Sequence, residues 1–320
     1  MSEHKPYLII GDGQVGSALM DKLGEQAVQS RRDTLDLSKA AASDYLELLH
    51  QYQPSVVINA AAYTQVDKAE EERELAMQIH ATAPGLLAEA CAARDILLVH
   101  YSTDYVFDGT GQKPWLEGDV ANPVNYYGET KLAGEQAIQQ AGGKHLIFRI
   151  SWVYAQQGAN FVNTMLKLGA KRESLNIVAD QTGAPCYAED IAKATIEVVT
   201  SFQQCRSLSQ RTLGSSSNTA NCEEILASAG MTDLSGVYHM CSSGETTWYD
   251  FALEIFDHAN RYQPMLIRNI KAVPTSEYPT PAKRPHNSRM NCDRLKHTFD
   301  ISLPHWKGSL LRYMEKKYAN

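Results

Sequence analysis

The sequence predicts an α/β protein built on a doubly wound parallel sheet of the Rossmann type. Over the first 150 residues, short apolar runs rich in β-branched residues alternate with longer helical patterns rich in alanine. This alternation is typical of parallel strands joined by crossover helices. A glycine-rich turn directly follows the first run, and 43% of the 320 residues are hydrophobic and 21% charged, as in ordinary globular proteins.

The elements of the sheet can be placed in chain order. We expect strands at residues 7–10, 26–29, 55–59, 96–100 and 146–149. We expect the intervening helices at residues 14–23, 43–51, 71–93 and 126–140, with stops at Pro54 and at the pair Gly142 and Gly143. Residues 1–170, completed by a helix near residues 188–200, are therefore predicted to form a dinucleotide-binding domain.

The pattern loosens after residue 150. Helices are predicted near residues 160–171, 188–200, 247–258 and 306–317, and short strands at residues 175–179 and 237–240. Residues 171–320 are expected to form most of a smaller, discontinuous substrate domain. Residues 201–221 are rich in Ser, Gln and Asn and lack an apolar period, so we interpret them as a polar surface loop.

Composition and charge exclude several classes of protein. Thirty basic against 37 acidic residues give a net charge of -7, which argues against a nucleic-acid partner. The apolar runs are shorter than the roughly 20 residues that span a bilayer, and the first residues lack the apolar segment of a signal peptide, so a cytoplasmic protein is expected. The six cysteines form no C-x-x-C pair, which predicts reduced thiols and no metal site.

A G-x-G-x-x-G motif follows the first strand and opens the next helix. It comprises Gly11, Gly13 and Gly16, with Val15 before the last glycine. Glycines at these positions let the backbone turn tightly and approach a pyrophosphate, and the helix N-terminus offers free N–H groups and a positive dipole end. The motif in this context predicts a dinucleotide site; the alternative is a tight turn that holds no ligand.

The end of the second strand indicates which dinucleotide is bound. An NAD site usually has an Asp or Glu there for the ribose hydroxyls, whereas this sequence has Arg31 and Arg32. Two guanidinium groups suit a 2′-phosphate, because each offers charge-assisted hydrogen bonds. We therefore predict NADPH, and NAD stays open because Asp33 follows directly.

Three side chains predict an active site at the carboxyl end of the sheet. Tyr127 and Lys131 are four residues apart at the start of a predicted helix, so both project from one face. Moving a phenol from a pKa of about 10 to about 7 needs roughly 4 kcal/mol, which one ammonium at about 4 Å supplies. Thr103 follows the fourth strand, where its hydroxyl can bond the carbonyl oxygen that the tyrosine protonates.

Longer segments resemble the extended short-chain dehydrogenase/reductase family over nearly the whole chain. They read NAAAYT at residues 59–64, VDKAE at 66–70, YSTDYVFDG at 101–109, NYYGETKLAGE at 125–135, RISWVY at 149–154, DQTGAP at 180–185 and YPTPAKRPHNS at 278–288. The resemblance implies an oxidoreductase that reduces the 4-keto group of dTDP-4-dehydro-6-deoxy-L-mannose to dTDP-L-rhamnose with NADPH. It implies a dTDP-sugar as the partner, and leaves a homodimer open.

The resemblance also implies roles for individual residues. Tyr127 would be the general acid, Lys131 would lower its pKa and hold the ribose, and Thr103 would orient the 4-keto oxygen. Besides Tyr127, Lys131, Arg31 and Arg32, the cofactor contacts would fall on Gly11, Gly13, Val15, Gly16, Asp36, Leu37, Ala62, Thr64 and Tyr101. The substrate contacts would fall on Thr103, Asp104, Trp152 against the sugar and Arg284 at the diphosphate.

Other interpretations stay open, because a fold alone does not settle function. The chain also fits another nucleotide-sugar reductase or an epimerase, or a non-catalytic NADP-binding subunit like the regulatory subunit of methionine adenosyltransferase. Trp152 also fits a core aromatic, and Arg284 a surface residue on a rigid turn. His100, in the fourth strand, is interpreted as a core histidine.

Overall fold

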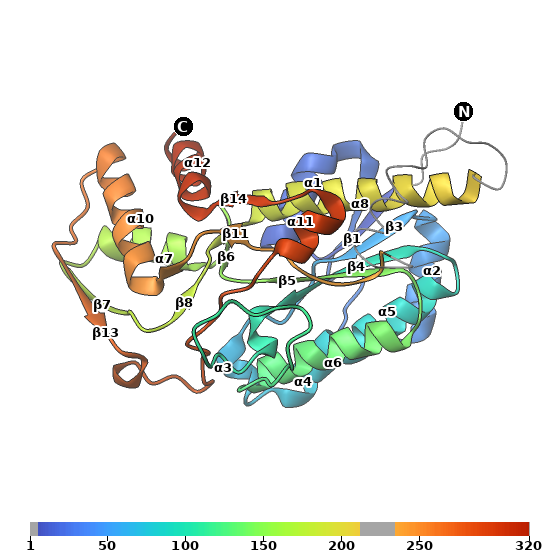
Figure 1. Ribbon diagram of the computed structural model, residues 1–320, viewed down its shortest axis with the longest axis horizontal. Coiled ribbons are helices and arrows are strands. Elements are labelled where there is room, and N and C mark those ends of the chain that lie inside the picture. The colour runs from blue at the N-terminus through green and yellow to red at the C-terminus, as the bar shows by residue number, and fades with distance from the viewer. Residues whose placement is uncertain (1–5, 212–233, 320) are drawn as a thin grey trace.

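A computed structural model describes residues 6–211 and 234–319 of the chain (Figure 1). A central sheet is covered by helices on both faces, and a smaller group of helices and short strands lies at one end of it (Figure 1). The predicted fold class is confirmed, because helices cover both faces of a sheet whose strands are all parallel.

The central sheet has six strands in the order β10-β5-β4-β3-β1-β2. Their bounds are β1 Tyr7–Ile10, β2 Ala27–Ser30, β3 Val56–Asn59, β4 Leu97–Thr103, β5 His145–Ile150 and β10 Gly236–His239. The strand order reverses between β1 and β3, and ligands of such sheets bind beyond the carboxyl ends of the strands at this switch point. The topology therefore places a site where the glycine motif and the loop after β3 meet.

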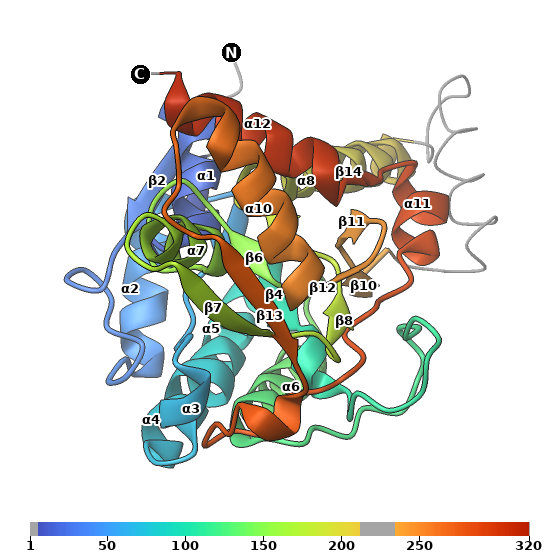
Figure 2. The ribbon, with the colours of Figure 1, turned by 90° about the vertical axis from the view of Figure 1, so that its left-hand side faces the viewer.

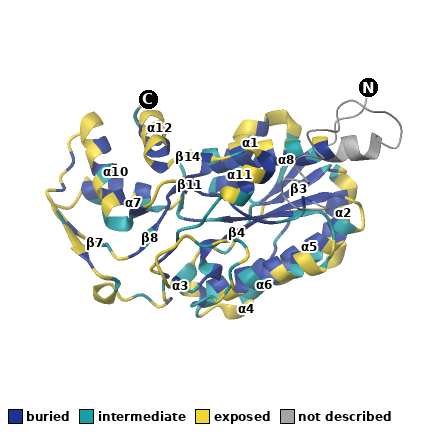
Figure 3. Cartoon of the chain, in the orientation of Figure 1, coloured by how far each residue is buried: buried dark blue, intermediate teal, exposed yellow. Residues whose placement is uncertain are grey.

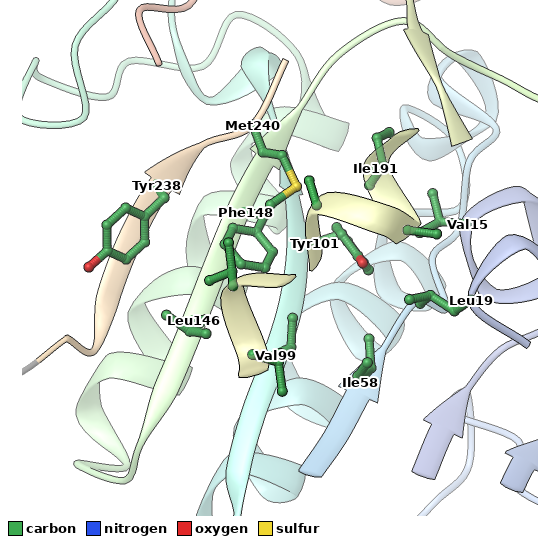
Figure 4. Close-up of a cluster of buried hydrophobic side chains, with 14 of the residues drawn as sticks. Val15, Leu19, Ile58, Val99, Tyr101, Leu146, Phe148, Ile191, Tyr238 and Met240 are labelled. Atoms are coloured by element: carbon green, nitrogen blue, oxygen red, sulfur yellow. The ribbon is translucent and has the colours of Figure 1, made fainter. Parts of the chain in front are cut away.

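Each face of the sheet has its own helical layer and its own apolar core. One layer comprises α1 (Gln14–Leu23), α8 (Ala188–Arg211) and α11 (Asp293–Phe299), and the other comprises α2 (Ala42–Tyr52), α5 (Ala83–Ala92) and α6 (Tyr126–Gln140). The strands between them are buried on both sides (Figure 3). In the first core, Val99 and Phe148 of the sheet lie opposite Leu19 and Ile191 of the helices (Figure 4). Burial of such side chains on both faces is the main stabilising contribution.

The group at the end of the sheet packs around a third apolar core. Its helices are α7 (Phe161–Gly169), α10 (Trp248–Tyr262) and α12 (Trp306–Tyr318), and β7 (Ser174–Val178) pairs with β13 (Asn269–Val273) beside them (Figure 2). Short strand pairs join this group to the main sheet: β6 (Val153–Tyr154) with β9 (Cys186–Tyr187), β8 (Thr182–Gly183) with β12 (Thr246–Thr247), and β11 (Ser242–Ser243) with β14 (Leu303–His305).

The predicted polar loop is wrong over residues 201–211, which continue helix α8. Val198, Phe202 and Cys205 recur at helical spacing and are buried in the core of that face, so a narrow apolar stripe keeps this polar segment helical. Residues 212–221 of the predicted loop lie outside the described residues.

The cysteines only partly agree with the expectation that all are reduced. Cys205 is disulfide-bonded, so this expectation is wrong there, whereas Cys91, Cys186, Cys241 and Cys292 are free.

The helix predicted over residues 71–93 is divided in the structure. It comprises α4 (Arg73–Met77), a π-helical turn at Gln78–Thr82 and α5, preceded by the short helix α3 (Val66–Ala69). The sixth strand of the sheet, β10, comes from the C-terminal half and pairs with β5. In the described parts of the chain, no helix is both long and apolar enough to cross a membrane.

Candidate active site

The glycine motif forms an open cradle at the switch point of the sheet. Gly11 has a φ of +100°, and its N–H donates to the carbonyl of Ser30 at the end of β2 (2.9 Å). A Cβ on Gly16 would lie 2.3 Å from the Gly11 oxygen, so this approach of helix to loop requires glycine. A Cβ on Gly13 would meet nothing within 4 Å, and the N-terminus of α1 has no side-chain cap. Free N–H groups facing open space fit the pyrophosphate of a dinucleotide.

The end of β2 presents one buried and two exposed polar groups for the adenosine end of a dinucleotide. The hydroxyl of Ser30 is buried and has no hydrogen-bond partner among the described residues. Arg31 donates to the side chain of Gln29 (3.3 Å), and Arg32 pairs with Asp36 (3.6 Å), with both guanidinium groups exposed. Bonds from Ser38 hold the pKa of Asp36 below its usual value. Leu37 is buried beside this loop, and the guanidinium groups fit a 2′-phosphate.

The loop after β3 holds the other predicted cofactor residues. Ala62 and Thr64 are exposed in it, and Tyr63 between them donates its N–H to Nε2 of His80 (2.9 Å). The buried side chain of His80 reaches this loop from the π-helical turn before α5. Such turns often occur at functional sites, because they push one side chain out of register.

The start of α6 is fixed from three sides. Asn125 accepts a hydrogen bond from the N–H of Gly128 (2.8 Å) and so caps the helix. The N–H of Tyr126 donates to Glu70 (2.8 Å). A Cβ on Gly128 would lie 2.1 Å from the carbonyl oxygen of Tyr105, so only glycine lets α6 pack this closely on the turn after β4. These contacts place the next side chains of the helix over the carboxyl end of β4.

Tyr127 meets Thr103 at this edge of the sheet. Their hydroxyl groups lie close to each other, and Thr103 donates to Asp104 (3.1 Å). The rings of His80 and Tyr105 contact the Tyr127 ring edge-on, at centroid distances of 5.2 and 5.7 Å. Burial raises the pKa of Tyr127, and the charge of Asp104 raises it further, while the neighbouring Thr103 hydroxyl lowers it. Burial also raises the pKa of Asp104, to about 6.

Lys131 is buried one turn further along α6 and faces the backbone of β4. Its Nζ donates to the carbonyl of Tyr101 (2.5 Å) and lies 3.2 Å from Nε2 of His100. Burial lowers the pKa of Lys131 to about 8. The amine is thus turned toward β4, and burial is the largest influence on the pKa of the phenol; that Lys131 lowers this pKa stays a prediction.

The two residues expected at the substrate have protein partners. Trp152 adopts a positive φ of 46° and stacks on Trp248, with ring centroids 3.6 Å apart, so one face of its ring is already covered. Arg284 forms a bidentate pair with Asp67, at 3.0 and 2.8 Å, which ties the segment before residue 288 to α3. The structure therefore brings Thr103, Tyr127 and Lys131 together and holds Arg284 away from them on a carboxylate.

Sequence reasoning missed two histidines of this site. His80 lies 47 positions before Tyr127 and contacts it only through the fold, so no spacing in the sequence signals it. His100 is buried as predicted, but its ring also contacts the amine of Lys131. In both cases the only sequence signal for a role in the site was a histidine among apolar residues.

The parallel sheet has a glycine cradle at its switch point, and three side chains meet at the carboxyl end of β4: Thr103, Tyr127 and Lys131. This combination defines a dinucleotide-dependent oxidoreductase of the short-chain type. The family of the RmlD substrate binding domain matches residues 7–221 and 214–319. The chain belongs to this family.

Individual relatives agree with this assignment. The chain is 42% identical over 274 residues to a dTDP-4-dehydrorhamnose reductase of Escherichia coli (strain K12), covering 85% of this chain and 83% of the relative. It is 40% identical over 301 residues to the enzyme of that name from Burkholderia thailandensis, covering 92% and 93%. A crystal structure of the Bacillus anthracis dTDP-4-dehydrorhamnose reductase in complex with NADP superposes with a TM-score of 0.82 at 31% identity, covering 98% and 99% of the two chains.

Proposed function

We infer that this protein is an NADPH-dependent reductase of dTDP-4-dehydro-6-deoxy-L-mannose, with dTDP-L-rhamnose as its product. The observation that carries this conclusion is that Thr103, Tyr127 and Lys131 lie together at the carboxyl edge of the sheet. The family and the relatives named above support the same reaction. A subunit that only binds NADP has no use for an acid and its two partners together.

The catalytic roles follow from the positions of these three side chains. When bound, NADPH supplies the hydride that goes to C4 of the sugar. Tyr127 donates its proton to the oxygen at C4, and burial, which raises the pKa of the phenol, keeps it protonated before the reaction. Thr103 orients the same oxygen with its hydroxyl. Lys131 holds the ribose next to the nicotinamide through its amine.

The remaining predicted residues surround the same edge. Gly11, Gly13, Val15 and Gly16 would hold the pyrophosphate, with Arg31 and Arg32 at the 2′-phosphate and Asp36 and Leu37 at the adenine. Ala62, Thr64 and Tyr101 would make further contacts with the cofactor. Asp104 and Trp152 would contact the sugar. Arg284 would reach the diphosphate only after its ion pair with Asp67 breaks.

We propose that residues 171–320 form most of the substrate domain, and that a homodimer is the assembly to test.

The substrate preference tests the function directly. We expect NADPH oxidation with dTDP-4-dehydro-6-deoxy-L-mannose to exceed that with other keto-sugar nucleotides in kcat/KM, because the hydroxyl pair acts on a 4-keto oxygen. A spectrophotometric assay over a panel of keto-sugar nucleotides measures this. Equal rates across the panel contradict the proposed substrate. Purified protein that carries tightly bound NAD and oxidises no NADPH indicates an epimerase instead.

The preference for NADPH tests the arginines at the end of β2. We expect the double variant Arg31→Ala/Arg32→Ala to raise KM for NADPH about tenfold, because charge-assisted bonds to the 2′-phosphate are lost from an exposed site. KM for NADH should stay within about twofold, since NADH lacks this phosphate. Lys39→Ala, a cation removed from the same loop, is the matched control. A parallel loss for both cofactors contradicts a role in phosphate recognition.

A further inference from the structure

Three polar side chains form a buried row behind the active site. Asn59, at the end of β3, lies with its amide nitrogen 3.2 Å from Nδ1 of His100 on the neighbouring strand β4. Nε2 of the same imidazole lies 3.2 Å from Nζ of Lys131 on α6. Asn59 and His100 are each 1% exposed and Lys131 is 2% exposed, so water cannot replace a poorly matched hydrogen bond in this row.

The backbone fixes the orientation of the Asn59 amide. Its Oδ1 accepts a hydrogen bond from the N–H of Ala61 (3.2 Å). If the amide were reversed, its NH₂ group would face that N–H, and two donors would meet in a buried place. The NH₂ group of Asn59 is therefore the side that faces His100.

The amide in turn fixes the tautomer of His100. Because Asn59 presents a donor, Nδ1 of the imidazole accepts and carries no proton. A neutral imidazole then has its proton on Nε2, which is the nitrogen that faces Lys131. An ammonium at Nζ would point a proton at this N–H, whereas a neutral amine accepts its hydrogen bond while still donating to the carbonyl of Tyr101.

We propose that Asn59 and His100 are positioning residues for Lys131: Asn59 keeps the imidazole proton on Nε2, and this N–H stabilises the uncharged amine, so that Lys131 gives up and regains a proton in each turnover. During reduction Tyr127 loses its proton to the sugar oxygen. The Lys131 ammonium is the source of the proton that returns to the phenolate; it thereby becomes an amine, and water protonates this amine again and is left as hydroxide. The chemistry balances without any further reactant.

The surroundings of the row support the proposal. Burial lowers the pKa of Lys131 to about 8, and the N–H of His100 favours the amine further. Burial and the charge of Lys131 hold the pKa of His100 well below its usual value, with a smaller contribution from His80. Glu135 on α6 opposes the shift at Lys131, but its carboxylate is bound by Arg149 of β5 (2.7 Å). The catalytic part of the proposal rests on the proposed function, whereas the tautomer does not.

His80 provides an internal reference, because its contacts impose the opposite tautomer. Its Nε2 accepts from the N–H of Tyr63 (2.9 Å), so its proton lies on Nδ1, which faces the hydroxyl of Thr130 (2.9 Å). The hydroxyl of Thr130 donates onward to the carbonyl of Tyr127 (2.9 Å). Two neutral buried imidazoles of the same protein are thus expected to hold their protons on different nitrogens.

Nitrogen NMR of the full-length protein labelled with ¹⁵N at histidine tests the tautomer without any assay of activity. We expect His100 to be neutral at pH 7 with the proton on Nε2, and His80 to be neutral with the proton on Nδ1. The loss of one set of signals in His100→Gln assigns them. A protonated Nδ1 on His100, or an imidazolium, overturns the proposal even if the reductase activity is present.

The pH dependence of kcat tests the effect on Lys131. Activity should fall as pH rises through the pKa of Lys131, because the amine cannot restore the proton of Tyr127. In Asn59→Asp the new carboxylate accepts from both Ala61 and His100, moves the imidazole proton to Nδ1 and favours the ammonium. We expect the falling limb to move to higher pH by about one unit. His100→Gln, whose side-chain oxygen can accept from the ammonium, should move it in the same direction.

Asn59→Leu is the matched control, since it removes the amide from the same place without providing an acceptor. It should lower activity without moving the limb to higher pH. If Asn59→Asp and Asn59→Leu lower kcat alike, and in both kcat falls at the same pH as in the wild-type protein, the row has only a packing role and the proposal is wrong. Absence of NADPH-dependent reduction in the wild-type protein refutes the proposed function and leaves the NMR result to decide the tautomer.

Discussion

Replacing Tyr127 with phenylalanine is expected to lower kcat by about 10²–10⁴-fold, the usual contribution of a positioned general acid. The change removes one hydroxyl group and keeps the ring, so the edge-on contacts with His80 and Tyr105 remain. The hydroxyl acts only in the chemical step, so the Kd for NADPH should stay within about twofold. Steady-state NADPH oxidation measures kcat, and titration of NADPH fluorescence measures the affinity.

Tyr126→Phe is the matched control for this substitution. It removes a phenol hydroxyl from the preceding position of α6, where the ring lies under the guanidinium of Arg73. Its kcat should remain close to that of the wild-type protein. If Tyr127→Phe retains full activity, Tyr127 is not the acid; if it loses NADPH binding as well, the substitution has disturbed the fold.

Most of the main sheet could be predicted because its signals are local. Helix α6 begins at Tyr126 and ends at Gln140, as the sequence predicts, since a glycine pair follows its last residue. The place of β10 beside β5 could not be predicted, because a short apolar run does not reveal its partner. The polar composition of residues 201–211 wrongly indicates a loop. The buried side chains of Val198, Phe202 and Cys205 are enough to hold this segment in a helix.

The candidate site divides in the same way. Thr103, Tyr127 and Lys131 were predictable from short spacings next to predicted strands. What the spacing of Tyr127 and Lys131 could not show is where the amine points, because that depends on the carbonyl of Tyr101 and on His100. That Lys131 lowers the pKa of the phenol therefore stays a prediction, although both residues lie at the expected edge of the sheet. Charges act over a few ångströms, and such distances are set by tertiary packing.

Helix α6 carries both Tyr127 and Lys131, so the precision of the site depends on what anchors this helix. Its N-terminus is held by Asn125 and by the close approach at Gly128. Two turns further on, Glu135 forms a bidentate pair with Arg149 of β5 (2.9 and 2.7 Å). Arg149 also lies against the ring of Phe107 and 3.4 Å from Nε2 of His239 on β10. One guanidinium thus connects α6 with two strands of the sheet.

Replacing Arg149 with methionine is accordingly expected to cost about 3–5 kcal/mol of unfolding free energy, because the carboxylate of Glu135 stays buried without its partner. The two side chains are only 6% and 2% exposed, so solvent does not screen the loss. Urea unfolding followed by circular dichroism measures the change. The double variant Arg149→Met/Glu135→Leu, which removes both charges, should recover part of the lost stability, since no unpaired charge remains.

Arg261→Met is the matched control, because Arg261 forms an i,i+4 pair with Asp257 in which both side chains are more than 60% exposed. An exposed pair contributes about 0–1 kcal/mol, so this variant should unfold close to the wild-type midpoint. If Arg149→Met is no more destabilising than Arg261→Met, the buried pair does not anchor α6. If Arg149→Met is strongly destabilising and the double variant recovers nothing, the cost comes from lost packing on Phe107 and not from the unpaired charge.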